Sequence, residues 1–322
     1  MIRVGILGTA SIARLFFGGP LHHASILGIA SRDPVRAGEF AKHYGIPQTF
    51  PTYEALIGDN NIDAVYIPLP QHLHCEYTVK AAEAGKHVLV EKPAALSTAE
   101  IQRMAEACRL HNVVLMEGFM YRFKSIHHRV RSLVQDGTLG AVRYLDFSWS
   151  FNIGKLVRSQ FRLDRFAGGG ALNDLGIYGL DFLHFLGLPD PSLVHASILR
   201  DDPAGVDMFT HMVWQTGPAL ASITCGFNCD ANYYMVCGEL GSVIVPGSLS
   251  GRIRENTLRL HMLYHDHHTD EVFPAENPYL KELDHFAVCI ETGREPETGG
   301  DNALRNLRLI EMVRERGQML AE

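Results

Sequence analysis

Short apolar runs alternate with helix-forming segments over the first 120 residues, and this alternation restricts the possible folds more than any other feature of the chain. The runs that read as buried strands are Ile2–Leu7, Ser25–Ser31, Asp63–Ile67, His87–Val90 and Val113–Met116. Strands separated by helices usually pair in parallel, with the helices covering both faces of the sheet. The pattern therefore predicts an N-terminal α/β domain, residues 1–120, with a doubly wound parallel sheet.

Two helix starts within this domain carry capping signals. Asp33 and Pro34 give an N-cap followed by a first-turn proline. Ser97 and Glu100 match a capping box. A shorter helical stretch is expected from Ser11, directly after the first strand. These helices would supply the crossovers that a parallel sheet requires.

The pattern changes from about Leu139, where strand-like stretches follow one another with a single helix, Ala171–Leu186, among them. These stretches are Val142–Phe151, Ser192–Leu199, Met208–Gln215 and Ala219–Phe227. Strands without crossover helices indicate antiparallel or mixed pairing. We predict a C-terminal α+β domain, residues 121–322, with a mostly antiparallel or mixed open sheet, and a cleft between two closely packed halves.

The bulk composition excludes several classes of protein. The formal net charge is −7 and basic runs are short, which argues against a nucleic-acid partner. No apolar stretch has the length of a bilayer span, and a strand begins at residue 2 without a signal-peptide pattern. We expect a cytoplasmic protein without a membrane partner, in which the six cysteines are reduced.

Two groups of possible metal ligands are present but have unfavourable spacing. Cys225 and Cys229 are separated by three residues, and His265, His267 and His268 form the second group. Zinc sites usually show tighter pairs, such as two cysteines separated by two residues. We therefore expect no metal site.

The segment after the first strand has part of a dinucleotide-binding signature. In the pattern glycine-x-glycine-x-x-glycine the aligned positions are Gly8, Ala10 and Ala13, so only the first is a glycine. A strand-to-helix turn of this kind presents free backbone N–H groups to a pyrophosphate. A tight turn without a ligand is the alternative. The expected cofactor contacts at this turn are Gly8, Thr9, Ala10, Ser11 and Ile12.

The end of the second strand favours one dinucleotide over another. An NAD site normally places an acidic side chain at this position, where it binds the ribose 2′-hydroxyl. Here Ser31 and Arg32 supply a hydroxyl and a guanidinium, which suit a 2′-phosphate. Asp33 is better explained as the helix cap. We therefore expect NADP(H) rather than NAD(H), bound in part by Ser31 and Arg32.

A charged pair and a proline follow the strand His87–Val90 at once. Ligands of open parallel sheets lie beyond the carboxyl ends of the strands, so Glu91 and Lys92 are expected at the ligand-binding edge. A lysine in that place can carry a proton or stabilise developing negative charge. The alternative is a solvated loop with an incidental ion pair.

A glycine-rich entry, Gly168–Gly170, precedes the helix Ala171–Leu186. Asp174 and Tyr178 stand four residues apart, which places them on one face of an α-helix. Taken singly, the aspartate would be a surface residue near a helix start and the tyrosine a core residue. Together with Lys92 they are candidates for acid–base partners.

These motifs occur in an order that resembles the glucose-fructose oxidoreductase / inositol dehydrogenase / rhizopine catabolism (Gfo/Idh/MocA) family over essentially the whole chain. The resemblance is carried by the Gly8 turn, Ala84–Val88 leading to Glu91–Pro93, Met116–Phe123, Gly168–Tyr178 and Tyr279–Phe286 ahead of Thr292–Arg294. The most similar branch contains dihydrodiol dehydrogenases, NADP-linked D-xylose dehydrogenases and glucose-fructose oxidoreductase. The resemblance implies a Rossmann domain followed by an α/β substrate-binding and oligomerisation domain, in a homodimer or homotetramer.

The resemblance also implies roles for single residues. Lys92 matches a catalytic lysine, Asp174 a substrate-binding aspartate, and Tyr178 the acid–base position, which is histidine in inositol dehydrogenases. Ala10 departs from the family's middle glycine, which bears on cofactor affinity. Further cofactor contacts are implied for Pro68, Leu69, Gln71, His74, Glu91, Lys92 and Arg162. Residues that either line the substrate pocket or pack near it are His127, His128, Phe151, Asn152, Arg158 and Tyr233.

The predicted reaction is hydride transfer between the nicotinamide of NADP(H) and a secondary alcohol or carbonyl carbon of a sugar, polyol or dihydrodiol. Tyr178 would exchange the proton. An unperturbed phenol has a pKa of about 10, which is high for a base at neutral pH. A cation ~4 Å away would stabilise the phenolate by ~4 kcal/mol at an effective dielectric constant of ~20, which lowers the pKa by roughly three units. Lys92 could supply this cation. Two alternatives remain: a non-catalytic protein that senses sugar and nucleotide, and a reductase of a non-sugar carbonyl or imine.

Overall fold

The computed structural model describes residues 1–155, 160–200, 205–247, 249–263 and 268–320, which form two compact units. Unit 1 comprises Met1–Phe119 and Tyr279–Leu307, and unit 2 comprises Met120–Pro278 and Arg308–Glu322. The sequence predicts one boundary near residue 120, whereas in the structure the segment Tyr279–Leu307 returns to unit 1 before the chain ends in unit 2. Long-range packing explains this return: the rings of Phe16 and Tyr279 meet edge to face, with centroids 6.4 Å apart.

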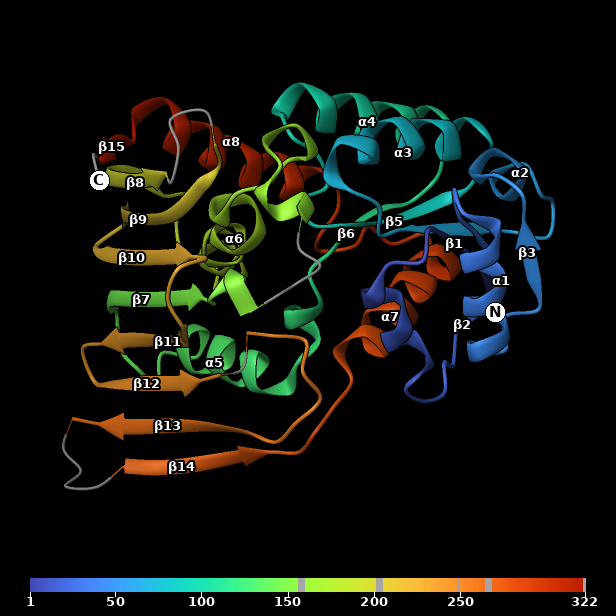
Figure 1. Cartoon of the computed structure of the whole chain (residues 1–322). Coiled ribbons are helices and arrows are strands. Elements are labelled where there is room, and N and C mark those ends of the chain that lie inside the picture. The colour runs from blue at the N-terminus through green and yellow to red at the C-terminus, as the bar shows by residue number, and fades with distance from the viewer. Residues whose placement is uncertain (156–159, 201–204, 248, 264–267, 321–322) are drawn as a thin grey trace. The chain divides into compact units, whose positions relative to one another are not determined.

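A six-stranded parallel sheet forms the centre of unit 1 (Figure 1). Its strands are β1 (Ile2–Leu7), β2 (Ala24–Ala30), β3 (Gln48–Phe50), β4 (Ala64–Ile67), β5 (His87–Glu91) and β6 (Leu115–Gly118). The order is β3-β2-β1-β4-β5-β6, so the topology switches direction between β1 and β4. The predicted doubly wound Rossmann sheet is confirmed, and its ligand-binding edge lies at the carboxyl ends of these strands.

Helices flank this sheet. They are η1 (Ser11–Phe17), α1 (Pro34–Tyr44), α2 (Tyr53–Ile57), η2 (Gln71–Leu73), α3 (His74–Glu83), α4 (Thr98–Leu110), α7 (Pro278–Thr292) and the first part of α8 (Gly300–Arg316). In Figure 1, α3 and α4 lie on one side of the sheet and α7 on the other. Both faces of the sheet are therefore covered, as a buried parallel sheet requires.

Both predicted helix caps are present. The Asp33 carboxylate accepts two backbone N–H groups of α1, at 3.0 and 3.2 Å. Ser97 Oγ accepts the backbone N–H of Glu100 at 3.2 Å. The Glu100 carboxylate in turn accepts the N–H of Leu96, one residue before the position that a capping box implies. These side chains explain where α1 and α4 begin.

A nine-stranded mixed sheet forms the centre of unit 2, in the order β14-β13-β12-β11-β7-β10-β9-β8-β15. The strands are β7 (Val142–Ser150), β8 (Ser192–Arg200), β9 (Asp207–Thr216), β10 (Ala219–Gly226), β11 (Ala231–Gly238), β12 (Gly241–Pro246), β13 (Asn256–Met262), β14 (His268–Phe273) and β15 (Gln318–Leu320). The pairs β7–β10 and β8–β15 are parallel and the other pairs are antiparallel. The prediction of a mostly antiparallel or mixed sheet is confirmed.

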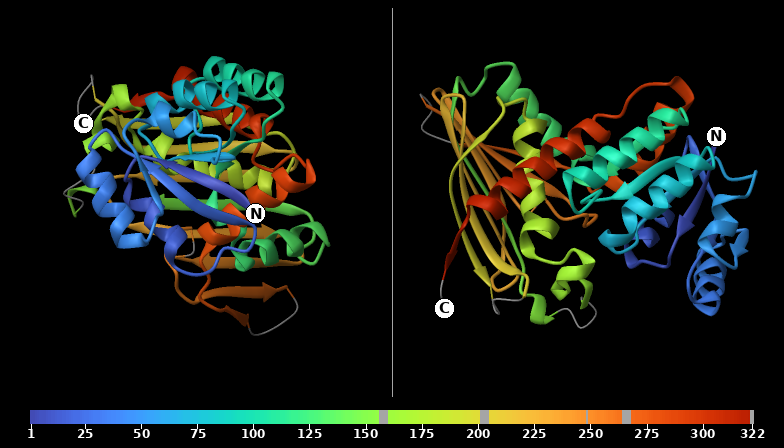
Figure 2. Two further views of the ribbon diagram at one scale, coloured as in Figure 1. Left: turned by 90° about the vertical axis from the view of Figure 1, so that its right-hand side faces the viewer. Right: turned by 90° about the horizontal axis from the view of Figure 1, so that it is seen from above.

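The helices of unit 2 are short. They are η3 (Met120–Phe123), α5 (Ser125–Gln135), η4 (Ile153–Lys155), η5 (Gln160–Leu163), η6 (Arg165–Ala167), the π-helical turn η7 (Leu172–Gly176) and α6 (Ile177–Phe185). The right-hand view of Figure 2 shows α5 and α6 on one face of the unit 2 sheet. Nearly every side chain of α6 is buried, so this helix forms the core of the unit.

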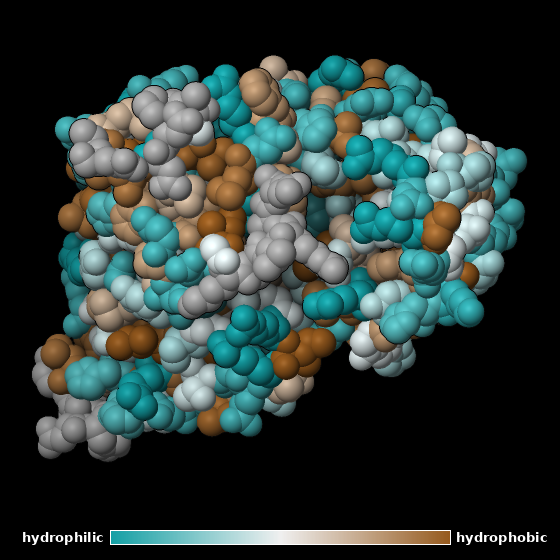
Figure 3. Space-filling view, viewed as in Figure 1, coloured by the Kyte–Doolittle hydropathy of each residue, from teal (hydrophilic) through white to brown (hydrophobic). Residues whose placement is uncertain are grey.

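Hydrophilic residues cover much of the face drawn in Figure 3, with apolar residues scattered among them. Exposed large apolar side chains from the unit 2 sheet include Tyr144, Leu220, Tyr233 and Ile244. Over the described residues, no helix is both long enough and apolar enough to cross a membrane.

Candidate active site

The turn after β1 has the geometry of a dinucleotide-binding turn. Gly8 has φ +102°, a left-handed conformation that glycine adopts without strain, and its N–H donates to the carbonyl of Ala30 at 2.7 Å. A Cβ at Gly8 would lie 3.1 Å from a methyl carbon of Leu69. The helical stretch expected from Ser11 is present as the 3₁₀ helix η1. The left-handed backbone conformation at residue 8 therefore requires a glycine, whereas alanine is present at position 10, the second glycine position of the motif.

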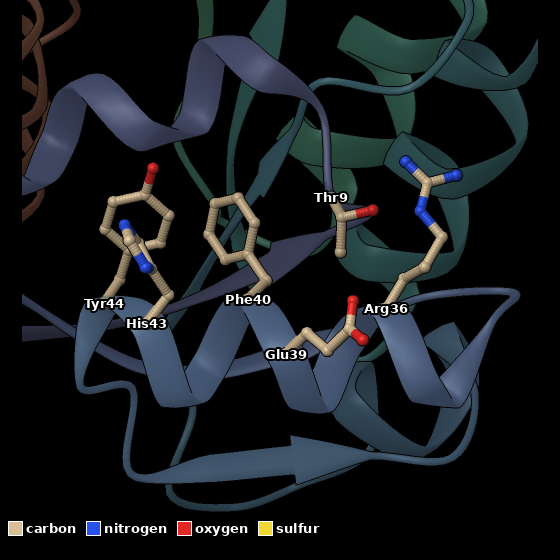
Figure 4. Close-up of a pocket in the computed structure, with 6 residues that line it drawn as sticks. All are labelled: Thr9, Arg36, Glu39, Phe40, His43 and Tyr44. Atoms are coloured by element: carbon tan, nitrogen blue, oxygen red, sulfur yellow. The ribbon is translucent and has the colours of Figure 1, made fainter.

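A pocket of about 360 Å³ opens next to this turn (Figure 4). Thr9 lines it on one side, and a face of α1 lines it on the other with Arg36, Glu39, Phe40, His43 and Tyr44. The glycine motif predicts Thr9 as a cofactor contact, but no sequence motif predicts the α1 residues. The available signal was the position of Arg36, one helical turn after Arg32, which places a second cation near the end of β2.

The two residues assigned to the 2′-phosphate differ in exposure. Ser31 is buried, and its Oγ accepts the backbone N–H of Asp33 at 3.2 Å. Arg32 and Arg36 are both exposed. The exposed guanidinium groups, rather than the buried hydroxyl, are the stronger candidates for binding an anion at this end of β2.

Lys92 lies directly after β5, where the sequence places it. The side chain is half-buried, and the peptide bond between Lys92 and Pro93 is cis. Glu91, the last residue of β5, accepts a 2.6 Å hydrogen bond from the hydroxyl of Tyr66 in β4. Glu117 of β6 accepts the N–H of Ala94 at 2.8 Å. Side chains of the two neighbouring strands thus hold the chain on both sides of Lys92.

His74 holds the same turn from a third direction. The imidazole is fully buried, with Nδ1 3.0 Å from the carbonyl oxygen of Pro93 and Nε2 2.7 Å from that of Leu69. Burial lowers the pKa of His74 to about 4, against the opposing effect of the two carbonyl oxygens. The neutral ring donates to one of these carbonyl groups, and only the protonated ring donates to both. The sequence analysis assigned His74 to direct cofactor contact. The structure places it in the core, where it joins the turn after β4 to the turn after β5.

Gln71 fits the predicted cofactor role better. Its side chain is only 7% exposed, and Oε1 has no hydrogen-bond partner among the described residues. A buried acceptor without a donor is costly unless a ligand or water supplies one. Pro68 and Leu69, just upstream, are also buried. A ribose hydroxyl is a donor of the kind that Gln71 lacks.

In unit 2 the start of the predicted helix is a π turn. The sequence predicts one helix, Ala171–Leu186, whereas the structure has η7 over Leu172–Gly176 before α6 begins. The half-buried Asp207 of β9 accepts the N–H of Leu172 on its carboxylate at 2.6 Å, and desolvation of the carboxylate raises the pKa of Asp207 to about 6. Single π turns occur frequently at functional sites.

Asp174 lies in this π turn and Tyr178 in the first turn of α6. Asp174 is 7% exposed and accepts a 2.6 Å hydrogen bond from Nε of Arg162. Tyr178 is 4% exposed, its ring centroid is 4.4 Å from that of Trp149, and its hydroxyl lies 3.4 Å from the sulfur of Met120. The predicted Arg162 and Asp174 therefore meet as an ion pair, which orients the aspartate.

A buried network adjoins Tyr178 that the sequence analysis did not assign. Asp181 accepts hydrogen bonds from Tyr121 Oη at 2.5 Å and from two nitrogens of Arg122 at 2.7 and 2.8 Å. The ring centroid of Tyr121 is 5.7 Å from that of Tyr178. The signal was the segment Met116–Phe123, which was recognised as family-like without a role. These bonds join α6 to η3, and the ring of Tyr121 packs against the ring of Tyr178.

The candidate pocket residues fall in different surroundings. His127 is fully buried, with Nδ1 2.8 Å from the hydroxyl of Tyr234, so it packs in the core. Tyr233 donates to Asp146 on the sheet at 2.9 Å. His128 and Asn152 are exposed, Phe151 is half-buried against Phe227, and Arg158, like His265 and His267, lies outside the described residues.

Among the described residues there is no group of three or more His, Cys, Asp or Glu side chains that could hold a metal ion.

Comparison with known proteins gives one family over both units. Residues 2–119 match the family model described as "Oxidoreductase family, NAD-binding Rossmann fold" (GFO_IDH_MocA), and residues 127–244 match the GFO/IDH/MocA C-terminal domain. A D-xylose 1-dehydrogenase (NADP(+)) from Haloferax volcanii is 32% identical over 97% of this chain and 96% of its own length. The chain belongs to the GFO/IDH/MocA oxidoreductase family. The family predicted from the motifs, and with it the oxidoreductase class, is confirmed.

Two further relatives of the GFO/IDH/MocA chain bear on the predicted branch. A trans-1,2-dihydrobenzene-1,2-diol dehydrogenase from Xenopus tropicalis is 29% identical over 70% of this chain and 68% of its own. The crystal structure of a 3-ketoreductase from Actinomadura kijaniata, in complex with NADP and TDP-benzene, superposes with a TM-score of 0.89 at 27% identity, over 99% of each chain. The named branch is therefore also confirmed.

Proposed function

We propose that this chain is an NADP(H)-dependent oxidoreductase that transfers a hydride between nicotinamide and a carbon of a sugar that carries a hydroxyl or carbonyl group. The observation that carries the proposal is the Lys92 turn. A lysine stands at the carboxyl end of β5, is held in place by His74, Glu117 and the Tyr66–Glu91 bond, and shares its sheet with the Gly8 turn. The relative named as a D-xylose 1-dehydrogenase (NADP(+)) supports the substrate class and the cofactor. The 3-ketoreductase structure in complex with NADP supports the cofactor.

The residues that would hold NADP(H) follow three strands of the unit 1 sheet, β1, β2 and β4, and Arg36 among them lies in the first turn of α1. The Gly8–Ile12 turn offers backbone N–H groups to the pyrophosphate. Arg32 and Arg36 offer guanidinium groups to the 2′-phosphate, and Gln71 offers an unpaired acceptor to a ribose hydroxyl. When bound, the nicotinamide supplies the hydride for reduction or takes it up in oxidation.

Tyr178 is proposed as the acid–base residue. In the reduction, the carbonyl carbon gains the hydride, the carbonyl oxygen takes the phenolic proton of Tyr178, and solvent returns a proton to the phenolate. Lys92 belongs to unit 1 and Tyr178 to unit 2; we propose that both act on the same substrate, with the ammonium stabilising the phenolate. Asp174, oriented by Arg162, would bind a substrate hydroxyl.

The first test is Tyr178→Phe. General acid–base catalysis contributes ~10²–10⁴-fold, so kcat for NADPH oxidation with a panel of keto- and aldosugars should fall by at least about 100-fold. The dissociation constant of NADPH, measured by fluorescence titration, should stay within about threefold. Tyr144→Phe, at an exposed tyrosine of the same unit, is the matched control and should leave both quantities unchanged.

The same measurements decide between the proposal and its alternatives. Wild-type turnover by Tyr178→Phe would refute the acid–base assignment. NADPH binding without turnover on any sugar, imine or other carbonyl compound would indicate a sensing protein. Turnover restricted to non-sugar carbonyl compounds or imines would keep the enzyme class and change the substrate. Polyol and dihydrodiol substrates, a homodimer or homotetramer, and a cytoplasmic location stay predictions.

A further inference from the structure

A cluster of two carboxyl groups and three aromatic rings lies in unit 1 at the end of β5, and all its members are buried except Glu91, which is half-buried. Its members are Phe16 of η1, Tyr66 of β4, Glu91 of β5, and Tyr279 and Glu282 of α7. The ring centroid of Phe16 is 4.8 Å from that of Tyr66 and 6.4 Å from that of Tyr279. The side chain of Glu282 is fully buried, and neither of its oxygens has a hydrogen-bond partner among the described residues.

The two carboxyl groups of this cluster differ in protonation state. The 2.6 Å bond from Tyr66 to Glu91 has the length expected for a hydroxyl that donates to an ionised carboxylate. Glu282 receives no such bond, and a buried carboxylate without a donor is costly. Burial, and then the charge of Glu91, raises the pKa of Glu282 well above its usual range. The cluster therefore carries its negative charge on Glu91 and a proton on Glu282.

The phenols that face this pair stay neutral as well. Burial, followed by the charge of Glu91, raises the pKa of both Tyr66 and Tyr279 well above 10. Because each phenol keeps its proton, Tyr66 remains a donor to Glu91 as the pH rises. Glu282 is then the group whose ionisation would add a second negative charge to the cluster.

We propose that Glu282 is a positioning residue for Lys92 and acts through Glu91. Glu91 directly precedes Lys92, and its bond to Tyr66 ties the end of β5 to β4, which pairs with β5 in parallel. A neutral Glu282 leaves Glu91 as the single charged acceptor for that bond. An ionised Glu282 would repel the Glu91 carboxylate and loosen the strand end that carries the lysine. The inference rests on the proposed role of Lys92.

Glu282→Gln tests the protonation state without reference to catalysis. The unfolded chain releases the proton of Glu282 near the ordinary pKa of 4.5, whereas the folded chain holds it to a higher pH. The free energy of unfolding of the wild type therefore falls as the pH rises above that value, up to the folded pKa. Glutamine has no proton to lose, so the variant should be at least as stable at about pH 8. Its Tm should also fall less between about pH 6 and pH 9.

Glu106→Gln is the matched control for the stability measurement. Glu106 of α4 is exposed and forms an ion pair with Arg109, which lowers the pKa of Glu106 and keeps its own charge throughout this pH range. Removing the Glu106 carboxylate should leave the alkaline fall in Tm unchanged. The proposal is overturned if Glu282→Gln melts several degrees below the wild type at about pH 8, or if its Tm follows the wild-type curve in parallel.

The effect on Lys92 is read from the pH profile of kcat. Glu282→Gln should keep kcat within about threefold of the wild type at about pH 7 and should lose less kcat than the wild type at about pH 9.5. Tyr66→Phe, which removes the donor to Glu91, should lower kcat while the KM for NADPH changes little. A tenfold loss in Glu282→Gln at about pH 7 would overturn the proposal. Full activity in Lys92→Ala would instead refute the proposed function and leave the stability result standing.

Discussion

At the scale of single residues, His74 shows the limit of assigning roles by position. The family resemblance implies contact between His74 and the cofactor. The direction of the ring is different, because both ring nitrogens lie against backbone carbonyl oxygens, of Leu69 and Pro93. A side chain's direction depends on which backbone groups need a partner in the folded state, and no sequence motif records this.

We expect His74→Ala to lower kcat at least about tenfold while the dissociation constant of NADPH changes less than about threefold. The reason is geometric: the variant releases the turn that carries Lys92, and a displacement of ~1 Å can cost up to ~100-fold in rate. Steady-state kinetics and a fluorescence titration measure the two quantities. His72→Ala, an exposed neighbour, is the control. If His74→Ala instead weakened NADPH binding and left kcat unchanged, the result would support direct contact between His74 and the cofactor.

At the scale of elements, the π turn η7 is the clearest difference between sequence and structure. Two of the partners that hold this turn, Asp207 and Arg314, lie far along the chain. Asp207 accepts the N–H of Leu172, while Asn173 donates to the carbonyl of Gly168 and accepts from Arg314. By contrast, the strands of unit 1 were predictable within one or two residues, because their signal is local apolar patterning. Strand β3 was missed because its three residues are mostly exposed.

Gly170→Ala should disrupt this turn. Gly170 has φ +116°, and a Cβ there would lie only 2.2 Å from Asp207 Oδ1, which is a steric clash. We expect a loss of roughly 1–3 kcal/mol in the free energy of unfolding from backbone strain, with further loss from the displaced Asp207 cap. Urea denaturation measures the stability, and kcat should fall as Asp174 shifts.

Gly137→Ala is the matched control for this substitution. Gly137 also has a positive φ, of +79°, but a Cβ there would meet nothing within 4 Å. Gly137→Ala should therefore lose only the part of the free energy of unfolding that comes from backbone strain, and its kcat should equal that of the wild type. Equal losses of stability and activity in the two variants would mean that the contact with Asp207 does not matter.

At the scale of the whole molecule, the sequence predicts the number of sheets and their type better than the path of the chain. Alternating strands and helices indicate a parallel sheet wherever they occur. The return of Tyr279–Leu307 to unit 1 is different, because it depends on contacts between residues far apart in the sequence, such as Phe16 and Tyr279. The Glu91–Glu282 cluster arises from this return, so no local pattern could have predicted it.

Cofactor preference can be measured on the whole chain through its stability. A ligand that binds only the folded state adds RT ln(1 + [L]/Kd), ~2.7 kcal/mol at a concentration of 100 Kd. We expect NADPH to raise Tm by a few degrees and NADH at the same concentration by less, because Arg32 and Arg36 are exposed cations at the predicted 2′-phosphate position. Arg36→Ser should reduce the NADPH shift towards the NADH value, while Arg109→Ser, an exposed arginine of α4, should change neither shift. Equal shifts for the two cofactors in the wild type would contradict the NADP preference. An undiminished NADPH shift in Arg36→Ser would leave Arg32 as the residue that binds the phosphate, because it is the other exposed cation at the end of β2.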